Sequence, residues 1–264
     1  MSNEQYLIEQ TLQGDKKALT LLMEPLQEKV YNLAVRYLWE PADAQDATQE
    51  IMIRVITHLS SFQGKSAFGT WVYRIAVNYL LNCKASRQEQ RQVSFDDFSQ
   101  YIKSDLDEHD YHGPDRNVLE QEVKLSCSTG LLLCLNREQR MAYLLGEVFE
   151  VDSDTGAEVC ETTPENFRKR LSIARDRIRS FMQGHCGIVN PVNACRCNKR
   201  ISLGLVSGRI AKDNLRFADK GEVLLTLSQV EALHDEAALY KQHPQYKTPE
   251  GMRSELARLL MDEQ

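Results

Sequence analysis

Four residues near position 190 are of the types that bind transition metals. His185 and Cys186 are adjacent, and Cys195 and Cys197 follow a short distance along the chain. Three thiolates and one imidazole are a sufficient ligand set for tetrahedral zinc. Because the spacing is not that of a standard zinc finger, reduced structural cysteines and a redox-sensing site stay open as alternatives. We expect no cofactor, with zinc at these four positions left open.

The cysteine count bears on the same question. The chain has seven cysteines, and an odd number in a chain without a signal peptide argues against a disulfide framework. Cys127 and Cys134 lie seven positions apart in a segment with helical periodicity. We interpret both as small core residues.

A second group of residues, between positions 154 and 179, has chemistry that suits DNA. A short helix containing Ala157 and Val159, a tight turn at 161–163 and a basic helix from Pro164 predict a helix-turn-helix. The second helix could enter a major groove with its first residues facing base edges or phosphates, namely Glu165, Asn166, Arg168 and Lys169. Arginines further along could hold the DNA backbone.

Positive charge is concentrated in this part of an acidic chain. The net charge is −6, yet residues 164–200 contain nine basic residues against two acidic ones, a net charge of +7. A local basic segment of this kind is typical of a DNA-binding protein whose acidic remainder limits non-specific binding. The alternative is a solvated charged helix face.

Aromatic and cationic residues alternate between Phe62 and Asn78. Phe68, Trp71, Lys65 and Arg74 lie in this segment. Rings can stack on unpaired bases while cations hold phosphates, so the pattern suits single-stranded nucleic acid. The alternative is that Phe68 and Trp71 are core residues.

A polar stripe precedes that segment. On a helix, Asp43, Asp46 and Glu50 fall three and four positions apart, opposite an apolar face. Such a stripe could bind a metal or a basic protein surface, and simple exposure to solvent is the alternative.

The elements that must position these residues are helices almost throughout. Apolar residues recur at three- and four-residue steps over 19–37, 47–59 and 71–80, and again from 118 to 182. Asn136 is expected to cap one helix, with Gln139 completing a capping box. We therefore predict an all-α fold with a helical bundle at 1–91 and a second helical domain at 118–183.

Two further segments have different compositions. Residues 94–122 contain nine acidic and two basic residues, which predicts a mobile acidic linker, placed at 92–117. A C-terminal extension is predicted at 184–264, with helices around 201–217, 224–241 and 249–261 and a possible regulatory role.

The polar stripe at 43–50, the aromatic and cationic segment at 62–78 and the helix-turn-helix at 154–179, taken in chain order, resemble the extracytoplasmic-function group (group 4) of the sigma-70 family of RNA polymerase sigma factors. Asp43 to Met52 is similar to the family's DAxDxxQEvF helix, with Asp46, Gln49 and Glu50 matching. Phe62 to Asn78 is similar to its promoter-melting segment, and 135–179 to its −35 helix-turn-helix domain. The resemblance covers about residues 19–181.

The resemblance implies a role for each segment. Contact with the β′ clamp helices of core RNA polymerase would involve Asp43, Asp46, Gln49 and Glu50, and the β flap is expected as a further polymerase contact. Binding and melting of the −10 element, including single-stranded DNA, would involve Phe62, Lys65, Phe68, Trp71, Arg74, Asn78, Lys84 and Arg87. Recognition of double-stranded −35 DNA would involve Thr163, Glu165, Asn166, Arg168, Lys169, Arg170 and Arg175. An anti-sigma partner is left open.

The sequence argues against other classes of protein. A membrane-spanning apolar stretch and a signal peptide are both absent from it, so we expect a cytoplasmic protein without membrane insertion. We find no pairing of nucleophile and base and no phosphate-binding loop, so we do not expect an enzyme. A stand-alone helix-turn-helix regulator is the remaining alternative, but it leaves residues 43–78 unexplained.

Overall fold

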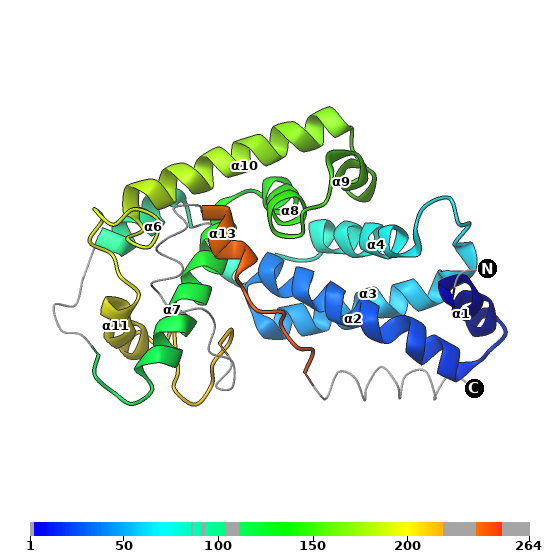
Figure 1. Ribbon diagram of the computed structural model, residues 1–264, viewed down its shortest axis with the longest axis horizontal. Coiled ribbons are helices and arrows are strands. Elements are labelled where there is room, and N and C mark those ends of the chain that lie inside the picture. The colour runs from blue at the N-terminus through cyan, green and yellow to red at the C-terminus, as the bar shows by residue number, and fades with distance from the viewer. Residues whose placement is uncertain (1–2, 86, 91–92, 104–110, 219–235, 250–264) are drawn as a thin grey trace. The chain divides into compact units, whose positions relative to one another are not determined.

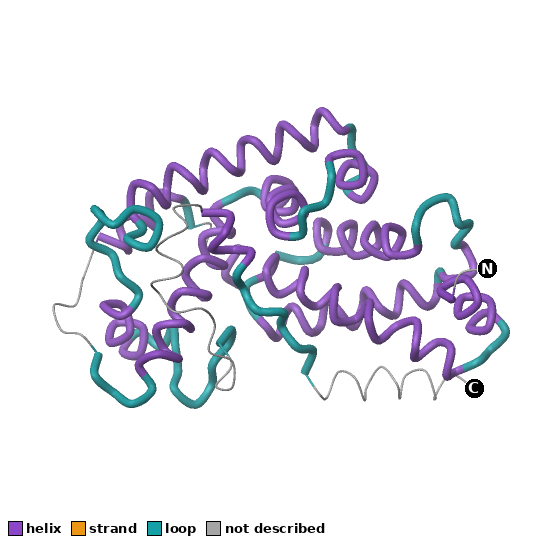
Figure 2. The backbone as a smooth tube through the Cα atoms, viewed as in Figure 1, coloured by secondary structure: helices purple, strands orange, loops and turns teal. Residues whose placement is uncertain are grey.

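The computed structural model describes residues 3–85, 87–90, 93–103, 111–218 and 236–249. Every regular element in this part of the chain is a helix, apart from an isolated bridge between Cys186 and Cys195 (Figures 1 and 2). The predicted all-α fold is confirmed. None of the described helices is long and apolar enough to cross a membrane.

The chain divides into two compact units. One comprises Met1–Lys84, Asp152–Phe167 and Gln245–Gln264, and the other comprises Ala85–Val151 and Arg168–Pro244. Each unit joins segments that are far apart in the sequence, whereas the four predicted domains are continuous stretches. The predicted boundaries at residues 91, 117 and 183 stay predictions.

The first unit is built on three packed helices, α2 (Lys16–Leu38), α3 (Pro41–Thr57) and α4 (Phe68–Asn82), preceded by α1 (Asn3–Leu12). Asp15 caps α2 by accepting hydrogen bonds from the N–H groups of Lys17 (2.8 Å) and Ala18 (3.1 Å). Pro41 stands at the start of α3, where its missing N–H is not needed. The predicted apolar face of α2 is buried at Leu22, Leu26, Val30, Leu33 and Tyr37.

The second unit contains α5 (Arg87–Gln90), α6 (Phe95–Lys103), α7 (Arg116–Leu131) and α8 (Arg137–Tyr143). The short helix η2 (Leu132–Cys134) joins α7 to α8, and a π-helical turn, η3 (Leu144–Val148), continues α8. Asn136 accepts a hydrogen bond from the N–H of Gln139 (2.8 Å), which confirms the predicted cap of α8. Helix α9 (Ser153–Val159) belongs to the first unit, and α10 (Pro164–His185) begins in the first unit and continues into the second.

Helix α6 lies inside the stretch predicted to be a mobile acidic linker, so part of that stretch is helical; the linker at 92–117 stays a prediction. Ser94 and Asp97 cap the helix reciprocally, since each accepts a hydrogen bond from the other's backbone N–H (3.1 and 2.9 Å). The rings of Phe95 and Phe98 pack against Phe181, with centroids 5.7 and 5.6 Å apart. The acidic residues of this stretch hid an apolar face with helical spacing.

The C-terminal extension folds onto α7. It contains η4 (Asn198–Arg200), α11 (Ile201–Val206) and α13 (Glu236–Lys241). Leu119 of α7 forms a small core with Ile201 and Ile210. The first predicted helix, 201–217, is shorter than expected because the chain turns at Gly208, whose φ is +70°. Parts of the other two predicted helices, at 219–235 and 250–264, lie outside the described residues.

Candidate nucleic-acid interface

Helices α9 and α10 form the predicted helix-turn-helix. Asp152 caps α9 by accepting from the N–H groups of Asp154 and Thr155 (both 3.0 Å). Hydrogen bonds hold the pKa of Asp152 below its usual value, and those from Thr155 have the largest effect. Gly156 allows close packing, because a Cβ there would collide with the ring of Phe167 at the start of α10.

The turn between the helices is a Schellman motif. The N–H of Thr162 donates to the carbonyl of Ala157 (3.0 Å), and the N–H of Glu161 donates to that of Glu158 (3.2 Å). Glu161 stands at the left-handed position with φ +49°, which favours glycine. The backbone of Glu161 is therefore strained, and this residue lies in the turn just before the candidate DNA-reading helix.

Helix α10 separates an apolar face from a polar one. Phe167, Leu171, Ala174 and Ile178 are buried, as the periodicity predicts. The hydroxyl of Thr163 caps the helix by accepting from the N–H of Asn166 (3.2 Å). The first turns expose Glu165, Asn166, Arg168 and Lys169.

The basic residues of α10 differ in their partners. Arg170 pairs with Glu138 (3.1 Å), Arg175 pairs with Glu147, and Arg179 pairs with Glu236 of α13 (2.8 Å). Within the described residues, Arg168 and Lys169 form no ion pair. The uncompensated cations of the predicted −35 set therefore lie in the first two turns, near the end that would enter a groove.

The polar stripe of α3 is on the outside of the helix. Asp46 is exposed, and Asp43, Gln49 and Glu50 are partly exposed. Glu50 pairs with Arg54 one turn later (3.0 Å), and both side chains are about half exposed. The opposite face of α3 is buried at Ala44, Ala47, Thr48, Ile51, Met52 and Val55. The structure thus presents all four predicted polymerase-contacting residues on a surface.

The segment before α4 is a loop held by an aromatic cluster. The ring centroid of Phe62 lies 5.1 Å from that of Phe68 and 5.5 Å from that of Trp71. Lys65 is exposed in this loop, and Gly64 adopts a positive φ of +66°. Phe68 and Trp71 are 1% and 7% exposed. Their burial favours a role in holding the shape of the loop over direct contact with a ligand for both rings.

The remaining predicted −10 residues lie along and after α4. Arg74 is partly exposed, and Asn78 and Lys84 are exposed. Asn78 accepts a hydrogen bond from the side chain of Asn82 (2.9 Å). The side chain of Arg87 lies outside the described residues.

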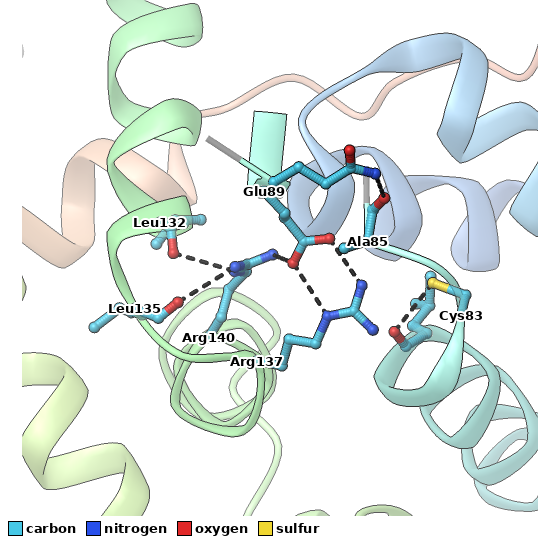
Figure 3. A network of polar contacts seen from close by, with 9 residues as sticks. Cys83, Ala85, Glu89, Leu132, Leu135, Arg137 and Arg140 are labelled. Atoms are coloured by element: carbon cyan, nitrogen blue, oxygen red, sulfur yellow. Dashed lines mark hydrogen bonds and ion pairs between the residues drawn. The ribbon is translucent and has the colours of Figure 1, made fainter. Parts of the chain in front are cut away.

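A buried carboxylate network that the sequence did not reveal fixes the start of α8. Glu89 of α5 accepts from Arg137 and Arg140, each at 2.8 Å (Figure 3). The guanidinium of Arg140 also donates to the carbonyl oxygens of Leu132 (3.1 Å) and Leu135 (3.3 Å). Because Glu89 is about fifty positions from both arginines, no local pattern indicates this pairing.

The predicted metal-ligand set is not brought together as a group. The ring of His185 packs against Phe181 (4.8 Å between centroids), and burial followed by the charge of Lys103 lowers its pKa. Among the residues that the structure describes, no group of three or more histidine, cysteine, aspartate or glutamate side chains is placed to hold a metal ion. Zinc binding stays a prediction.

Comparisons with known proteins bear on the whole arrangement. The family described as sigma-70 region 2 matches residues 22–92, which include α2, α3 and α4. The chain is 31% identical over 183 residues to the RNA polymerase sigma-H factor of Pseudomonas aeruginosa, covering 68% of this chain and 94% of that protein.

Two further relatives are both named ECF RNA polymerase sigma-E factor. The ECF RNA polymerase sigma-E factor of Haemophilus influenzae is 31% identical over 185 residues, with 68% of this chain and 95% of the relative covered. The one from Escherichia coli K12 is 30% identical over 182 residues, with 68% and 94% covered. About a third of this chain is therefore additional to these relatives. The chain belongs to the extracytoplasmic-function group of the sigma-70 family of RNA polymerase sigma factors.

Proposed function

We propose that this chain binds core RNA polymerase and directs promoter-specific transcription initiation. It does so by recognising the −35 and −10 elements and by separating the two DNA strands at the −10 element. The observation that carries the proposal is the start of α10, where exposed polar and cationic side chains follow a helix-turn-helix turn. Membership of the sigma factor family indicates that this helix acts in transcription initiation by RNA polymerase. In this role the chain itself makes and breaks no covalent bond.

The −35 element is read by the first turns of α10. Asn166 and Glu165 have the hydrogen-bonding groups that distinguish base edges in a major groove. Arg168 and Lys169 neutralise phosphates and fix the register of the helix on the duplex. Arg170 and Arg175 lie further along, where their acidic partners lower the positive charge that DNA meets.

The −10 element is opened at the loop before α4. Gln63, Gly64, Lys65 and Ala67 are exposed, while Phe62, Phe68 and Trp71 pack together at the base of the loop. A loop with a rigid aromatic base can receive an unstacked base without losing its own shape, which lowers the cost of ordering on binding. Arg74 and Asn78 extend this surface along α4.

The polar face of α3 binds the polymerase. An overall charge of −6 disfavours free association with DNA, so useful promoter affinity depends on the polymerase complex. Asp46 is the best single probe, because it is exposed and its opposite neighbours on α3 form the core.

The test is run-off transcription from a cognate promoter with purified core polymerase and the full-length chain. We expect transcripts that depend on this chain and fall at least about tenfold with Asp46→Ala, the effect of losing about 1.4 kcal/mol of binding. Glu24→Ala, an exposed acid on α2, is the matched control and should leave transcription unchanged. A chain that binds promoter DNA tightly but never core polymerase would instead be a stand-alone regulator.

A further inference from the structure

A short extended segment after α13 lies against α2 of the first unit. Residues 245–248, the tail segment, belong to that unit and form neither helix nor strand (Figure 1). Tyr246 and Thr248 are buried, whereas Gln245 and Lys247 are exposed. An extended chain turns successive side chains to opposite sides. The alternation therefore shows that one side of the tail segment packs against the unit.

Two prolines bracket the tail segment. Pro244 precedes it and Pro249 follows it. The residue before a proline is restricted to extended conformations, and proline itself has no N–H group with which to continue a helix. The sequence therefore keeps these residues extended and leaves their main-chain groups available to partners outside the segment.

The side-chain amide of Asn32 pairs with the main chain of Tyr246. Its oxygen accepts from the N–H of Tyr246 (2.7 Å), and its nitrogen donates to the carbonyl oxygen of Tyr246 (2.8 Å). The same exchange of two hydrogen bonds joins opposed residues of an antiparallel sheet. A side-chain amide has the donor and the acceptor of a peptide group, so Asn32 acts as a strand partner that is one residue long.

The hydrogen-bonding capacity of Asn32 is filled when the tail segment is in place. Its nitrogen also donates to the carbonyl oxygen of Glu28 (2.9 Å), and its oxygen also accepts from the guanidinium of Arg36 (2.8 Å). Asn32 is 2% exposed, and a buried amide is costly without partners. Because two of its four hydrogen bonds are made with Tyr246, Asn32 sets the register at which the segment packs.

Arg36 contacts the aromatic ring of the same tail residue. Its guanidinium carbon lies 4.7 Å from the ring centroid of Tyr246, within the range of a cation–π interaction. The guanidinium also donates to the main-chain carbonyl of Asn32 (3.0 Å), which fixes its orientation along α2. Main-chain pairing and ring contact together select an extended segment that has an aromatic residue at the paired position.

We propose that Asn32 and Arg36 form a binding site for an extended peptide with an aromatic residue, and that the tail segment is an exchangeable occupant of this site. Asn32 and Arg36 lie within the stretch that matches sigma-70 region 2, and Tyr246 lies outside it. Two hydrogen bonds and one ring contact are exchanged for contacts with water at modest cost. The segment therefore leaves the site while α2 stays folded. This site does not depend on the proposed promoter function.

Tryptic cleavage after Lys247 of the full-length chain measures how often the tail segment leaves. Cleavage of a segment that opens and closes quickly follows the population of its open form. We expect Asn32→Ala to raise the cleavage rate at least about tenfold, because the loss of 1.4 kcal/mol has this effect on an equilibrium. Gln13→Ala removes an exposed amide of the same unit and is the matched control. Equal rates in the two variants would overturn the proposal.

Cleavage after Lys29 distinguishes local opening from unfolding of the unit. Lys29 is an exposed residue of α2, and its peptide bond is protected while the helix is folded. We expect cleavage there to stay slow in Asn32→Ala. If it rises together with cleavage after Lys247, the variant is unfolded and binding of a free peptide decides the question.

A synthetic peptide of residues 243–249 tests recognition without any change at Asn32. The tethered segment competes at an effective concentration on the order of millimolar, so the receptor is the full-length Tyr246→Ala chain. We expect saturable binding by fluorescence anisotropy, weakened at least about tenfold when the backbone nitrogen of Tyr246 in the peptide is methylated. The peptide with Lys247→Ala should bind as well as the unmodified one, because that side chain is exposed.

The wild-type chain serves as the receptor if Tyr246→Ala does not fold. The Lys247→Ala peptide is not cleaved by trypsin at this position, so at millimolar concentration it should speed cleavage after Lys247 of the chain, and its methylated form should not. Equal effects of the methylated and unmethylated peptides would overturn the proposal. An absence of peptide binding to the folded chain would also overturn it, since the tail segment would then be a fixed part of the fold.

Discussion

Helices α2–α4 and the region from α7 to α13 are stabilised in different ways. The first three helices bury apolar residues at helical spacing, such as Leu33, Ile51 and Val72, which are at most 1% exposed. The second region depends on polar groups that find partners far along the chain. Glu122 of α7 is fully buried and accepts three backbone N–H groups, from Arg216, Phe217 and Ala218 (3.0, 3.0 and 2.8 Å).

Other long-range contacts in the second region follow the same rule. The side chain of Ser128 is hydrogen-bonded to His243 (2.8 Å), and the hydroxyl of Tyr240 donates to the carbonyl of Ser128 (2.9 Å). Arg200 is 5% exposed and donates to the carbonyl of Ile102. These contacts indicate that the C-terminal extension supplies partners for the buried polar groups of α7 and is therefore an integral part of that fold.

Truncation after Arg200 gives the largest test of this difference. The shortened chain loses the three N–H donors of Glu122 and uncovers the side of α7 on which Ile201 and Ile210 pack, which removes a large part of the stability of a small domain, about 5–15 kcal/mol. We expect hydrogen exchange to show lost protection over 116–131 and retained protection over 41–57, the residues of α3. Equal protection of α7 in the full-length and truncated chains would contradict the integrated fold.

The variant Glu122→Gln tests one contact within that fold. The amide keeps the shape but loses the charge and turns a donor toward N–H groups, so we expect a loss of about 3 kcal/mol in the free energy of unfolding. Chemical denaturation followed by circular dichroism measures it. Glu24→Gln, an exposed acid on α2, is the control and should change stability by less than about 0.5 kcal/mol. A loss equal to that of the control would mean that the three N–H bonds contribute little.

The same difference explains what the sequence could predict. Periodicity predicted α2, α3, α4 and the buried face of α10, because neighbours in sequence are neighbours on a helix face. The cap at Asn136 and the turn before Pro164 were also predictable from local residue types. The position of Glu89 beside Arg140 was not, because it depends on segments that only the tertiary fold brings together.

Two segments differ from what the sequence predicted, although their local residue types indicated the observed structure. The residues Ser94 and Asp97 have the spacing of a capping box, and Phe95, Phe98 and Ile102 have that of a helix face, yet the acidic composition favoured a linker. The helix expected at 201–217 contained Gly204 and Gly208, and the second of these marks the turn. Arg168 and Lys169 could be chosen from the sequence, but the sequence could not show that neither has an ion-pair partner among the described residues.

Within α10, a smaller effect is expected from the contrast between Arg170, which pairs with Glu138, and Arg168, which has no ion-pair partner among the described residues. Arg168→Ala should weaken promoter binding by the polymerase complex by about 1–3 kcal/mol if the side chain contacts a base. A phosphate contact should lower the slope of log K against log salt by about 0.9. Arg170→Ala is the matched variant and should have the weaker effect, since Glu138 already pairs with Arg170. Fluorescence anisotropy over a salt series measures both, and a larger effect of Arg170→Ala would reverse the assignment.

The turn before α10 gives the smallest effect, and one of unusual sign. A left-handed conformation costs a non-glycine residue about 1–2 kcal/mol, and Glu161 has this conformation. Glu161→Gly removes that strain but adds freedom to the unfolded chain, so we expect a net stabilisation of about 0.5–1 kcal/mol. Glu158→Gly, within α9, should instead destabilise by about 1 kcal/mol. Thermal unfolding of both variants measures the difference. If the unfolding midpoint temperature falls for both variants, the left-handed turn does not strain the folded protein. Glutamate at position 161 would then be as stable there as glycine.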